Sequence, residues 1–204
     1  MGSYTLGAVE SICGVFADGT EHILDGVASL IDKSLLQQTE QEGEEPRLVM
    51  LETIREYGLE ALTDSGEEEI TRQAHAAYYL ALAEKAEPEF GGPEQATWLE
   101  RLEREHDNLR AALNWSLEQG KARRRMEMAL RLGGALRRFW LVHAHIGEGR
   151  VFLEQALAEG GEVAASVRAK ALVAAANLAA SQNDYDRTET LCQESLALFQ
   201  ELGD

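Results

Sequence analysis

The second half of the sequence repeats one helical pattern, and this repetition limits what the chain can fold into. Three short echoes recur at a spacing of about 40 residues: Ser116-Leu117, Ala156-Leu157 and Ser195-Leu196. The apolar positions between them follow helical spacing and predict two hairpins: 126–143 with 146–158, and 163–182 with 185–202. A lone hairpin leaves its apolar face uncovered, so the hairpins are expected to stack. Residues 202–204 are interpreted as an end reached within such an array, which leaves one face uncovered.

The first 62 residues predict a smaller domain with some β structure. Thr5 is expected to cap a helix that runs to about Phe16, and the following segments have these predicted structures: helix 21–32, strand 34–39, turn 40–46, strand 47–50 and helix 51–62. The last helix should have one apolar side, formed by Leu51, Ile54, Tyr57 (or Gly58) and Leu62. Helix, helix, hairpin and helix is the order of a winged-helix domain without its usual N-terminal helix.

A connecting region follows. Residues 63–66 are expected to end the preceding helix. The acidic residues 67–69 should form the first turn of the next helix, which runs to about Lys85. A longer helix is expected over 94–118. The predicted domains are therefore a partial winged helix at 1–62, a connecting helical hairpin at 63–120 and helical repeats at 121–204.

Composition places the chain among soluble globular proteins. Of the 204 residues 45% are hydrophobic, and only three are proline. The longest uncharged apolar run, 171–180, is far shorter than the roughly 20 residues of a membrane helix. No basic region followed by an apolar stretch marks a secretory signal. The two cysteines, Cys13 and Cys192, are interpreted as buried small side chains in a reduced, cytoplasmic protein. No membrane partner is expected.

Charge divides the chain. The formal net charge of −17 argues against nucleic-acid binding, which depends on neutralising phosphates. Residues 1–66 contain 13 acidic and 3 basic side chains, whereas residues 121–150 contain 8 basic and 2 acidic ones. Any attraction to an anionic partner should therefore lie in the second half.

A winged helix invites a DNA-binding hypothesis, with helix 21–33 in the major groove. That helix carries Glu21, Asp25 and Asp32. The wing carries four more carboxylates, Glu40, Glu42, Glu44 and Glu45. Both parts would repel phosphates, so direct binding to DNA is not expected.

The basic region has two interpretations. Lys121, Arg123, Arg124 and Arg125 can be a solvated helix start that offsets the acidic first half. Alternatively, aligning the hairpins as repeat units places four side chains along a concave groove: Arg131, Arg138, Lys170 and Asn177. Such a groove would bind a protein or peptide partner, acidic in character, or an acidic segment of the same polypeptide.

No catalytic or metal-binding arrangement stands out. His143 and His145 are two residues apart at a helix end, which should point them in different directions. Trp98, Trp115 and Trp140 are expected in the core. Gly133-Gly134 predicts a close approach between helices. The chain is therefore predicted not to be an enzyme and to hold no cofactor.

Several long segments resemble the bacterial STAND-class signal-transduction ATPases, whose members include LuxR-type and AfsR-like transcriptional regulators. The segments are Thr5-Leu6, residues 23–35 (ILDGVASLIDKSL), 50–57 (MLETIREY), 75–79 (HAAYY) and 98–110 (WLERLEREHDNLR). Asn183-Asp184-Tyr185-Asp186 resembles the inter-helix turn of a tetratricopeptide repeat (TPR). The implied fold is mainly α: a partial winged helix with a short β-hairpin, followed by a TPR-like α-solenoid of helical hairpins.

The resemblance implies a regulatory fragment that couples a nucleotide-binding domain to a sensor array. The chain has no G-x-x-x-x-G-K-[ST] phosphate loop. Related receptors contact nucleotide through a Met-His-Asp motif, and the matching position here, Met50-Leu51-Glu52, has no imidazole. Residues 47–62 are interpreted as the joint that transmits movement. The alternative hypotheses are a free-standing DNA-binding winged-helix regulator and an enzyme with a cryptic site.

Overall fold

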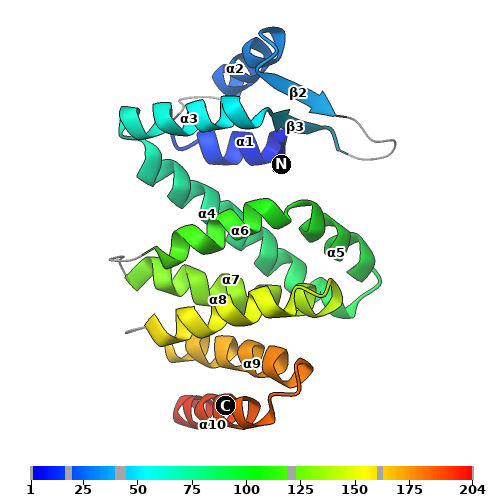
Figure 1. Cartoon of the computed structure of the whole chain (residues 1–204), viewed down its shortest axis with the longest axis vertical. Helices are drawn as coiled ribbons and strands as arrows, with labels where there is room; N and C mark the ends of the chain where they lie inside the picture. Colours follow the sequence, from blue (N-terminus) through cyan, green and yellow to red (C-terminus); the bar gives the residue numbers. More distant parts are fainter. Residues whose placement is uncertain (1, 17–19, 40–44, 119–122, 160–162, 204) are drawn as a thin grey trace. The chain divides into compact units, whose positions relative to one another are not determined.

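The computed structural model describes residues 2–16, 20–39, 45–118, 123–159 and 163–203. In this part of the chain the fold is mainly α-helical with one small antiparallel sheet, as the sequence predicts. Figure 1 shows the order of the elements. The fold divides into two compact units, Met1–Tyr78 with Arg104–Leu109, and Tyr79–Glu103 with Arg110–Asp204. The boundary falls inside two helices, α4 (Glu68–Ala86) and α6 (His106–Leu117).

The sheet of the first unit has the strand order β1-β3-β2. Its strands are β1 (Ser3–Thr5), β2 (Leu36–Thr39) and β3 (Arg47–Met50). The predicted hairpin is confirmed, since β2 and β3 pair antiparallel. Most of the predicted turn, residues 40–44, lies outside the described residues. Strand β1 was not predicted, because three residues are too short to show the alternation of a strand.

Two helices follow β1. Helix α1 (Leu6–Cys13) starts as expected, with the Thr5 hydroxyl accepting a hydrogen bond from the Ala8 amide at 3.2 Å. It ends three residues before the predicted Phe16. The break expected at 17–19 lies outside the described residues, and helix α2 spans Thr20–Asp32.

Helix α3 (Glu52–Ser65) forms where predicted but buries no side chain. Tyr57 is 70% exposed and Leu51 is 48% exposed, so the predicted apolar side of the helix is not buried. Gly66, at φ +76°, ends the helix in the left-handed conformation that glycine adopts without strain. Burial depends on tertiary neighbours, which the spacing of apolar residues does not identify.

Residues 87–118 differ most from the prediction. After α4 come a short 3₁₀ helix, η1 (Glu87–Gly91), and then α5 (Gln95–Arg104) and α6. The single helix expected over 94–118 is therefore wrong, because it is interrupted at Glu105. No glycine or proline marks this break. The Glu105 carboxylate takes part in tertiary hydrogen bonds in the first unit, described below, which the local pattern does not reveal.

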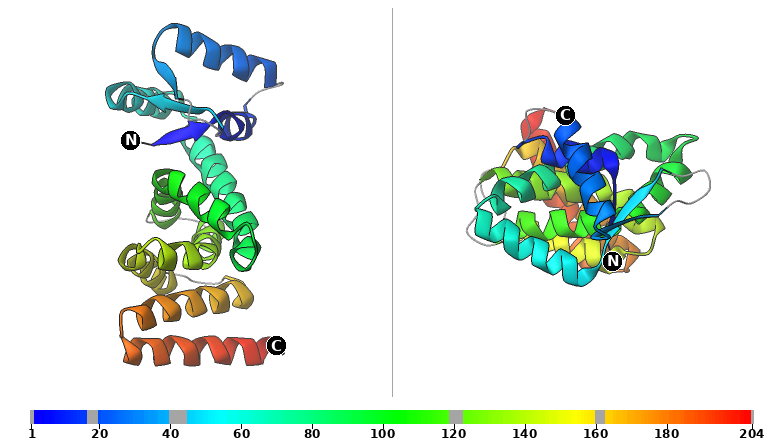
Figure 2. Two further views of the ribbon diagram at one scale, coloured as in Figure 1. Left: turned by 90° about the vertical axis from the view of Figure 1, so that its right-hand side faces the viewer. Right: turned by 90° about the horizontal axis from the view of Figure 1, so that it is seen from above.

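The second unit contains the predicted hairpins. They are formed by α7 (Arg123–Val142), α8 (Ile146–Glu159), α9 (Ala165–Ser181) and α10 (Tyr185–Leu202). Their bounds agree with the prediction to within about three residues, which is close to the usual uncertainty of helix ends. Helices α7 and α8 pack against each other and against α9, and α9 packs on α10. Figure 2 shows α9 and α10 lying side by side.

The turn between α9 and α10 is built from local hydrogen bonds. Asn183 adopts φ +62°, a conformation that asparagine tolerates better than most residues. Asp184 then caps α10 by accepting from the Arg187 amide at 3.2 Å. The Arg150 guanidinium also contacts Asp184, and this hydrogen bond lowers the pKa of the Asp184 carboxyl.

The core of the second unit is apolar and close-packed. Trp140, Phe139 and Trp115 are at most 3% exposed, which confirms the core role predicted for Trp115 and Trp140. Trp98 is only half-buried and lies beneath Arg101 instead. The predicted close approach is confirmed at Gly133, where an added Cβ would lie 2.6 Å from Leu153.

The remaining expectations concern the cysteines and the membrane. Cys13 and Cys192 are both free thiols. Cys192 is exposed and Cys13 is half-buried, so the expectation of two buried thiols is wrong. Across the described helices, none combines enough length with enough apolar character to span a bilayer.

Candidate functional site

The four residues predicted to bind a partner lie on two neighbouring helices of the second unit. Arg131 and Arg138 belong to α7, whereas Lys170 and Asn177 belong to α9. Helices α7 and α9 pack together. We call these four residues the groove set. The structure shows that three of them already have intramolecular partners.

Arg131 makes a bidentate ion pair. Its Nε and Nη2 atoms donate to the two carboxylate oxygens of Glu84, both at 2.8 Å. The hydrogen bond to Glu84 is the main cause that raises the pKa of Arg131. Such fork geometry is the strongest form of arginine–carboxylate pairing. A partner carboxylate would therefore have to compete with Glu84 for this side chain.

Lys170 and Asn177 are also engaged. The Lys170 ammonium forms an ion pair with Glu87 of η1, and its aliphatic stem lies against Gly134. Asn177 donates to the Val173 carbonyl of its own helix at 2.7 Å. Two acidic side chains near the end of α4, Glu84 and Glu87, thus supply intramolecular carboxylates to the groove set.

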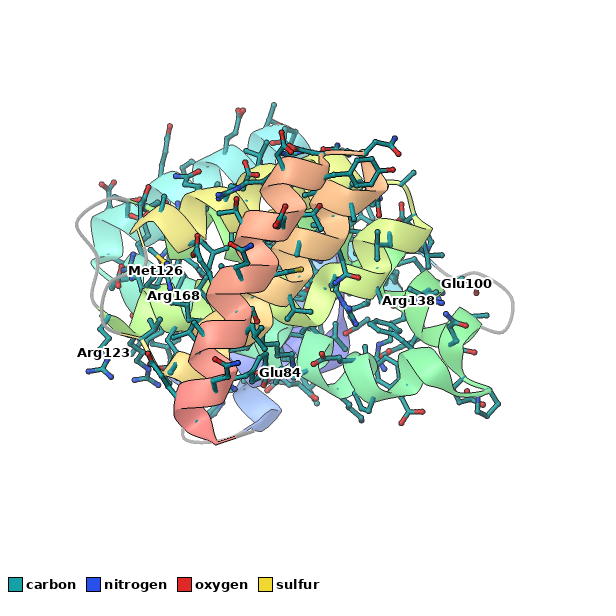
Figure 3. All side chains as sticks on the ribbon, turned by 90° about the horizontal axis from the view of Figure 1, so that it is seen from below. Glu84, Glu100, Arg123, Met126, Arg138 and Arg168 are labelled. Atoms are coloured by element: carbon teal, nitrogen blue, oxygen red, sulfur yellow. The ribbon has the colours of Figure 1, made fainter. Side chains whose placement is uncertain are left out.

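Arg138 and Lys170 are the exposed members of the groove set. Lys170 is paired with Glu87, whereas Arg138 forms no ion pair with any described residue. Figure 3 shows Arg138 and Arg123 on opposite sides of the view, as expected for the two ends of α7. Arg138 is therefore the cation of this set most accessible to an outside anion.

The basic cluster at the start of α7 is not uniformly solvated. Lys121 lies outside the described residues, and Arg123 and Arg124 are exposed. Arg125 is only 8% exposed, and its guanidinium carbon lies 4.0 Å from the ring centroid of Trp115. This cation–π contact and the burial that lowers the pKa of Arg125 indicate a packing role for this arginine.

A buried polar network, which the sequence did not reveal, lies in the first unit. Arg47, the first residue of β3, forms an ion pair with Glu105 at 2.7 Å. The same guanidinium donates to the side chain and carbonyl of Ser3 at 2.7 and 2.8 Å. Asn108 donates to Glu105 at 2.7 Å and to the Ser3 carbonyl at 2.8 Å. Strands β1 and β3 are thus tied to the first turn of α6.

Burial makes this ion pair more consequential than a surface pair. The side chain of Glu105 is 5% exposed and that of Arg47 is 15% exposed. Removing one partner of such a pair leaves an uncompensated charge. His75 of α4 belongs to the same unit, and its burial lowers its pKa to about 4, although the Glu105 charge acts in the opposite direction. His75 is therefore neutral at pH 7.

Helix α2 presents acidic and apolar side chains. Asp25 and Asp32 are exposed, whereas the wing residues 40–44 lie outside the described residues. A groove of about 360 Å³ lies beside the helix. It is lined mainly by apolar side chains, including Leu6, Leu24, Val27, Ile31 and Leu48. These features do not resemble a surface suited to a phosphate backbone.

The prediction that His143 and His145 point in different directions is wrong. Their rings are nearly parallel, at 10° with centroids 6.4 Å apart. Nδ1 of His143 and Nε2 of His145 lie 3.2 and 3.1 Å from the same oxygen, Oε2 of Glu103. The residue between them, Ala144, adopts φ +61°. A helical or extended backbone was assumed in the prediction, and the left-handed residue changes the side-chain directions.

Comparison with known proteins gives one set of relatives. The chain is 33% identical, over an alignment of 212 positions, to proteins named "Putative HTH-type transcriptional regulator" in Mycobacterium bovis and in two strains of Mycobacterium tuberculosis. The chain is thus similar to one region of proteins that carry this name. The alignment covers the whole chain but only 23% of each relative, so the chain spans about a quarter of their length. No family model matches the chain, and no solved structure matches it significantly.

Proposed function

We propose that this chain is a non-catalytic regulatory region of a larger, cytoplasmic transcriptional regulator of the STAND type. In such a protein, a partial winged helix would couple a nucleotide-binding domain, located elsewhere in the polypeptide, to a TPR-like sensor array. The observation that carries this proposal is the alignment of the entire chain to one quarter of much longer regulators. The proposal assigns no reaction and no cofactor to this chain. It also assigns no membrane partner and no nucleic-acid partner.

The buried network supports the coupling role. Arg47 begins the segment predicted to be a joint, and it binds Glu105 just before α6. Helix α6 then continues from the first unit into the second. A displacement of β3 would therefore act directly on the start of a helix that enters the array.

Hydrogen exchange tests this coupling. Replacing Arg47 by methionine removes the charge but keeps much of the stem, and we expect faster amide exchange in α6 as well as in β3. Arg55→Met is the matched control, because Arg55 is half exposed and forms an ion pair with its helix neighbour Glu52. Faster exchange confined to β3 would contradict the coupling role.

The groove set supports a protein or peptide partner of acidic character, or an acidic segment of the same polypeptide. Arg131 and Lys170 already donate hydrogen bonds to carboxylates in the structure, those of Glu84 and Glu87. The geometry of these side chains is therefore compatible with carboxylate binding. Arg138 would provide the initial attraction, because its charge is exposed.

A labelled octaglutamate peptide, followed by fluorescence anisotropy at low salt, tests this surface. Arg138→Glu should weaken binding by roughly tenfold, because it replaces attraction by repulsion. Glu84→Gln with Glu87→Gln should strengthen binding, because Arg131 and Lys170 lose their internal competitors. Arg55→Glu, an equal change of charge in the first unit, is the control. Equal affinity in the wild type and Arg138→Glu would refute the assignment.

The second candidate is a DNA-binding winged-helix regulator, and the name of the relatives, which includes "HTH-type", favours it. The acidic residues of α2 argue against it. A duplex-binding assay with this chain at low salt separates the two candidates. We expect no sequence-specific complex, and a specific complex that depends on α2 residues would establish the second candidate instead.

A further inference from the structure

The apolar groove beside α2 has no part in the coupling role proposed above, and its lining points to a binding partner. Nine described residues of the first unit line it, and all but Gln38 and Glu45 are apolar. We call it the α2 groove. We propose that it docks an amphipathic helix of a separate protein, whose apolar face is flanked by lysine and arginine side chains.

One wall of the α2 groove is a face of α2 itself. This face carries apolar side chains at positions i, i+3, i+4 and i+7 of the helix: Leu24, Val27, Ala28 and Ile31. Seven residues at about 1.5 Å each make the wall about 10 Å long, which is about two helical turns. None of the described residues of α2 is buried, and Leu24 is 40% exposed. A face with this spacing is suited to another helix, whose side chains fit between its ridges.

The other side of the α2 groove leads to the core of the first unit. Leu48 of β3 is 5% exposed, whereas Leu6 at the start of α1 is 37% exposed. Covering Leu6 and Leu24 would continue the apolar packing that Leu48 begins, and burial of apolar surface favours association. The volume of about 360 Å³ would also suit a small molecule. Small-molecule sites direct several polar groups at their ligand, however, and here only Gln38 and Glu45 are polar.

The charge of the first unit selects the flanks of the partner helix. Residues 1–66 contain 13 acidic and 3 basic side chains. Two of these three, Arg47 and Arg55, already form ion pairs within the unit. Lys33 is the third, and it is exposed at the end of α2. The field around the α2 groove is therefore negative, and it attracts a cationic partner.

Carboxylates also lie at the α2 groove itself. Glu45 lines it and is exposed. Asp25 and Asp32 are exposed and seven residues apart, so they lie on one side of α2, about 100° around the helix from Leu24 and Ile31. Lysine or arginine beside the apolar face of a docked helix would pair with them. The same carboxylates would repel the phosphates of nucleic acid or lipid, and also a second copy of this face.

Titration of the whole chain with a designed peptide tests the proposal. The probe is a labelled peptide of about 18 residues, made of leucine, alanine and lysine, with leucine at i, i+3, i+4 and i+7. Fluorescence anisotropy is measured at about 0.15 M salt, which screens distant charges. A peptide of the same composition with leucine spread around the helix should bind at least about tenfold more weakly. Equal binding of the two peptides would overturn the proposal, because charge alone would account for it.

Matched variants locate the binding surface. Leu24→Asn should weaken binding of the amphipathic peptide by about tenfold. Its control is Leu59→Asn on α3, since Leu59 and Leu24 are 38% and 40% exposed. Asp25→Lys should weaken binding by about fivefold, and Glu56→Lys, at an exposed position of α3, is its control. If each variant binds as tightly as its control, the peptide does not occupy the α2 groove.

A measurement on the wild type covers the case in which a variant fails to fold. In two-dimensional NMR spectra, the amphipathic peptide should shift the amide resonances of residues 24–31 and 45–48 first. Shifts confined to α3 or to the second unit would overturn the proposal. The Arg47–Glu105 ion pair is unchanged in all these variants. The docking proposal and the coupling role can therefore fail independently.

Discussion

The two units are both helical, but their helices are buried to very different degrees. In α7, 11 of 20 residues are buried, and α9 is enclosed by α7, α8 and α10. In α3, no residue is buried, and the described part of α2 has none either. The second unit is thus stabilised by apolar packing, whereas the first relies more on the polar network around Arg47 and Glu105.

This difference suits the proposed coupling role. The first unit exposes several large apolar side chains, among them Leu24, Tyr57 and Ile70 at 40%, 70% and 46%. A unit that changes its contacts needs such surface, while a sensor array needs a core that keeps its shape.

Truncation of a core side chain should show the largest contrast. Trp140→Ala should lower the free energy of unfolding by about 3–5 kcal/mol, because the indole is fully buried. Tyr57→Ala removes an aromatic ring of the first unit that is 70% exposed, and should change stability by at most about 0.5 kcal/mol. Urea denaturation of both variants measures the contrast. Similar losses of unfolding free energy in the two variants would show that the Tyr57 side chain is buried and not exposed.

The polar network of the first unit should be its most sensitive point. Glu105→Gln keeps the shape of the side chain but leaves the Arg47 charge without its counter-charge. We expect a loss of about 2–3 kcal/mol, less than for full removal of a buried partner. Glu52→Gln, at an exposed ion pair, should cost less than about 1 kcal/mol. If the denaturation curves of Glu105→Gln and Glu52→Gln coincide, the buried polar network does not stabilise the first unit more than an exposed ion pair does.

Two glycine substitutions should have opposite signs. A Cβ added at Gly149 would lie 2.4 Å from the buried ring of Trp140, so Gly149→Ala should cost about 1–3 kcal/mol. A Cβ added at Gly58, in exposed α3, meets nothing within 4 Å, so Gly58→Ala should stabilise by about 0.5–1 kcal/mol. Thermal unfolding followed by circular dichroism compares the two variants. Destabilisation by both substitutions would show that the side of α3 at Gly58 is packed against other residues and not exposed to solvent.

The pH dependence of the first unit should be a small effect. The pKa of His75 is about 4 in the folded state against an ordinary value of 6.5. The unfolded chain therefore binds a proton first as pH falls, and stability is lost between about pH 6.5 and 4. From pH 7 to 5.5 the loss should be about 1 kcal/mol. His75→Asn should remove this loss of stability between pH 7 and pH 5.5. Urea denaturation of the wild type and the variant at the two pH values measures it. An equal pH dependence of stability in the wild type and the variant would show that His75 is not buried.

Local features were predictable where the deciding contacts lie close in sequence. The Thr5 cap, the β2–β3 hairpin and the four helices of the array were all predicted, because each depends on spacing or capping within a few residues. The groove residues Arg131 and Lys170 were also identified from the sequence as a set of cations. Their pairing with Glu84 and Glu87 was not, because those carboxylates lie 47 and 83 residues away.

The sequence by itself determined that this chain forms paired helices with a short hairpin near its start, since apolar periodicity and turn residues act locally. Only the tertiary structure decided that the helix expected over 94–118 breaks at Glu105, that α3 stays exposed, and that His143 and His145 face one carboxylate. Each of these depends on contacts with residues distant in sequence, or on one unusual backbone angle. Neither leaves a periodic signal in the chain.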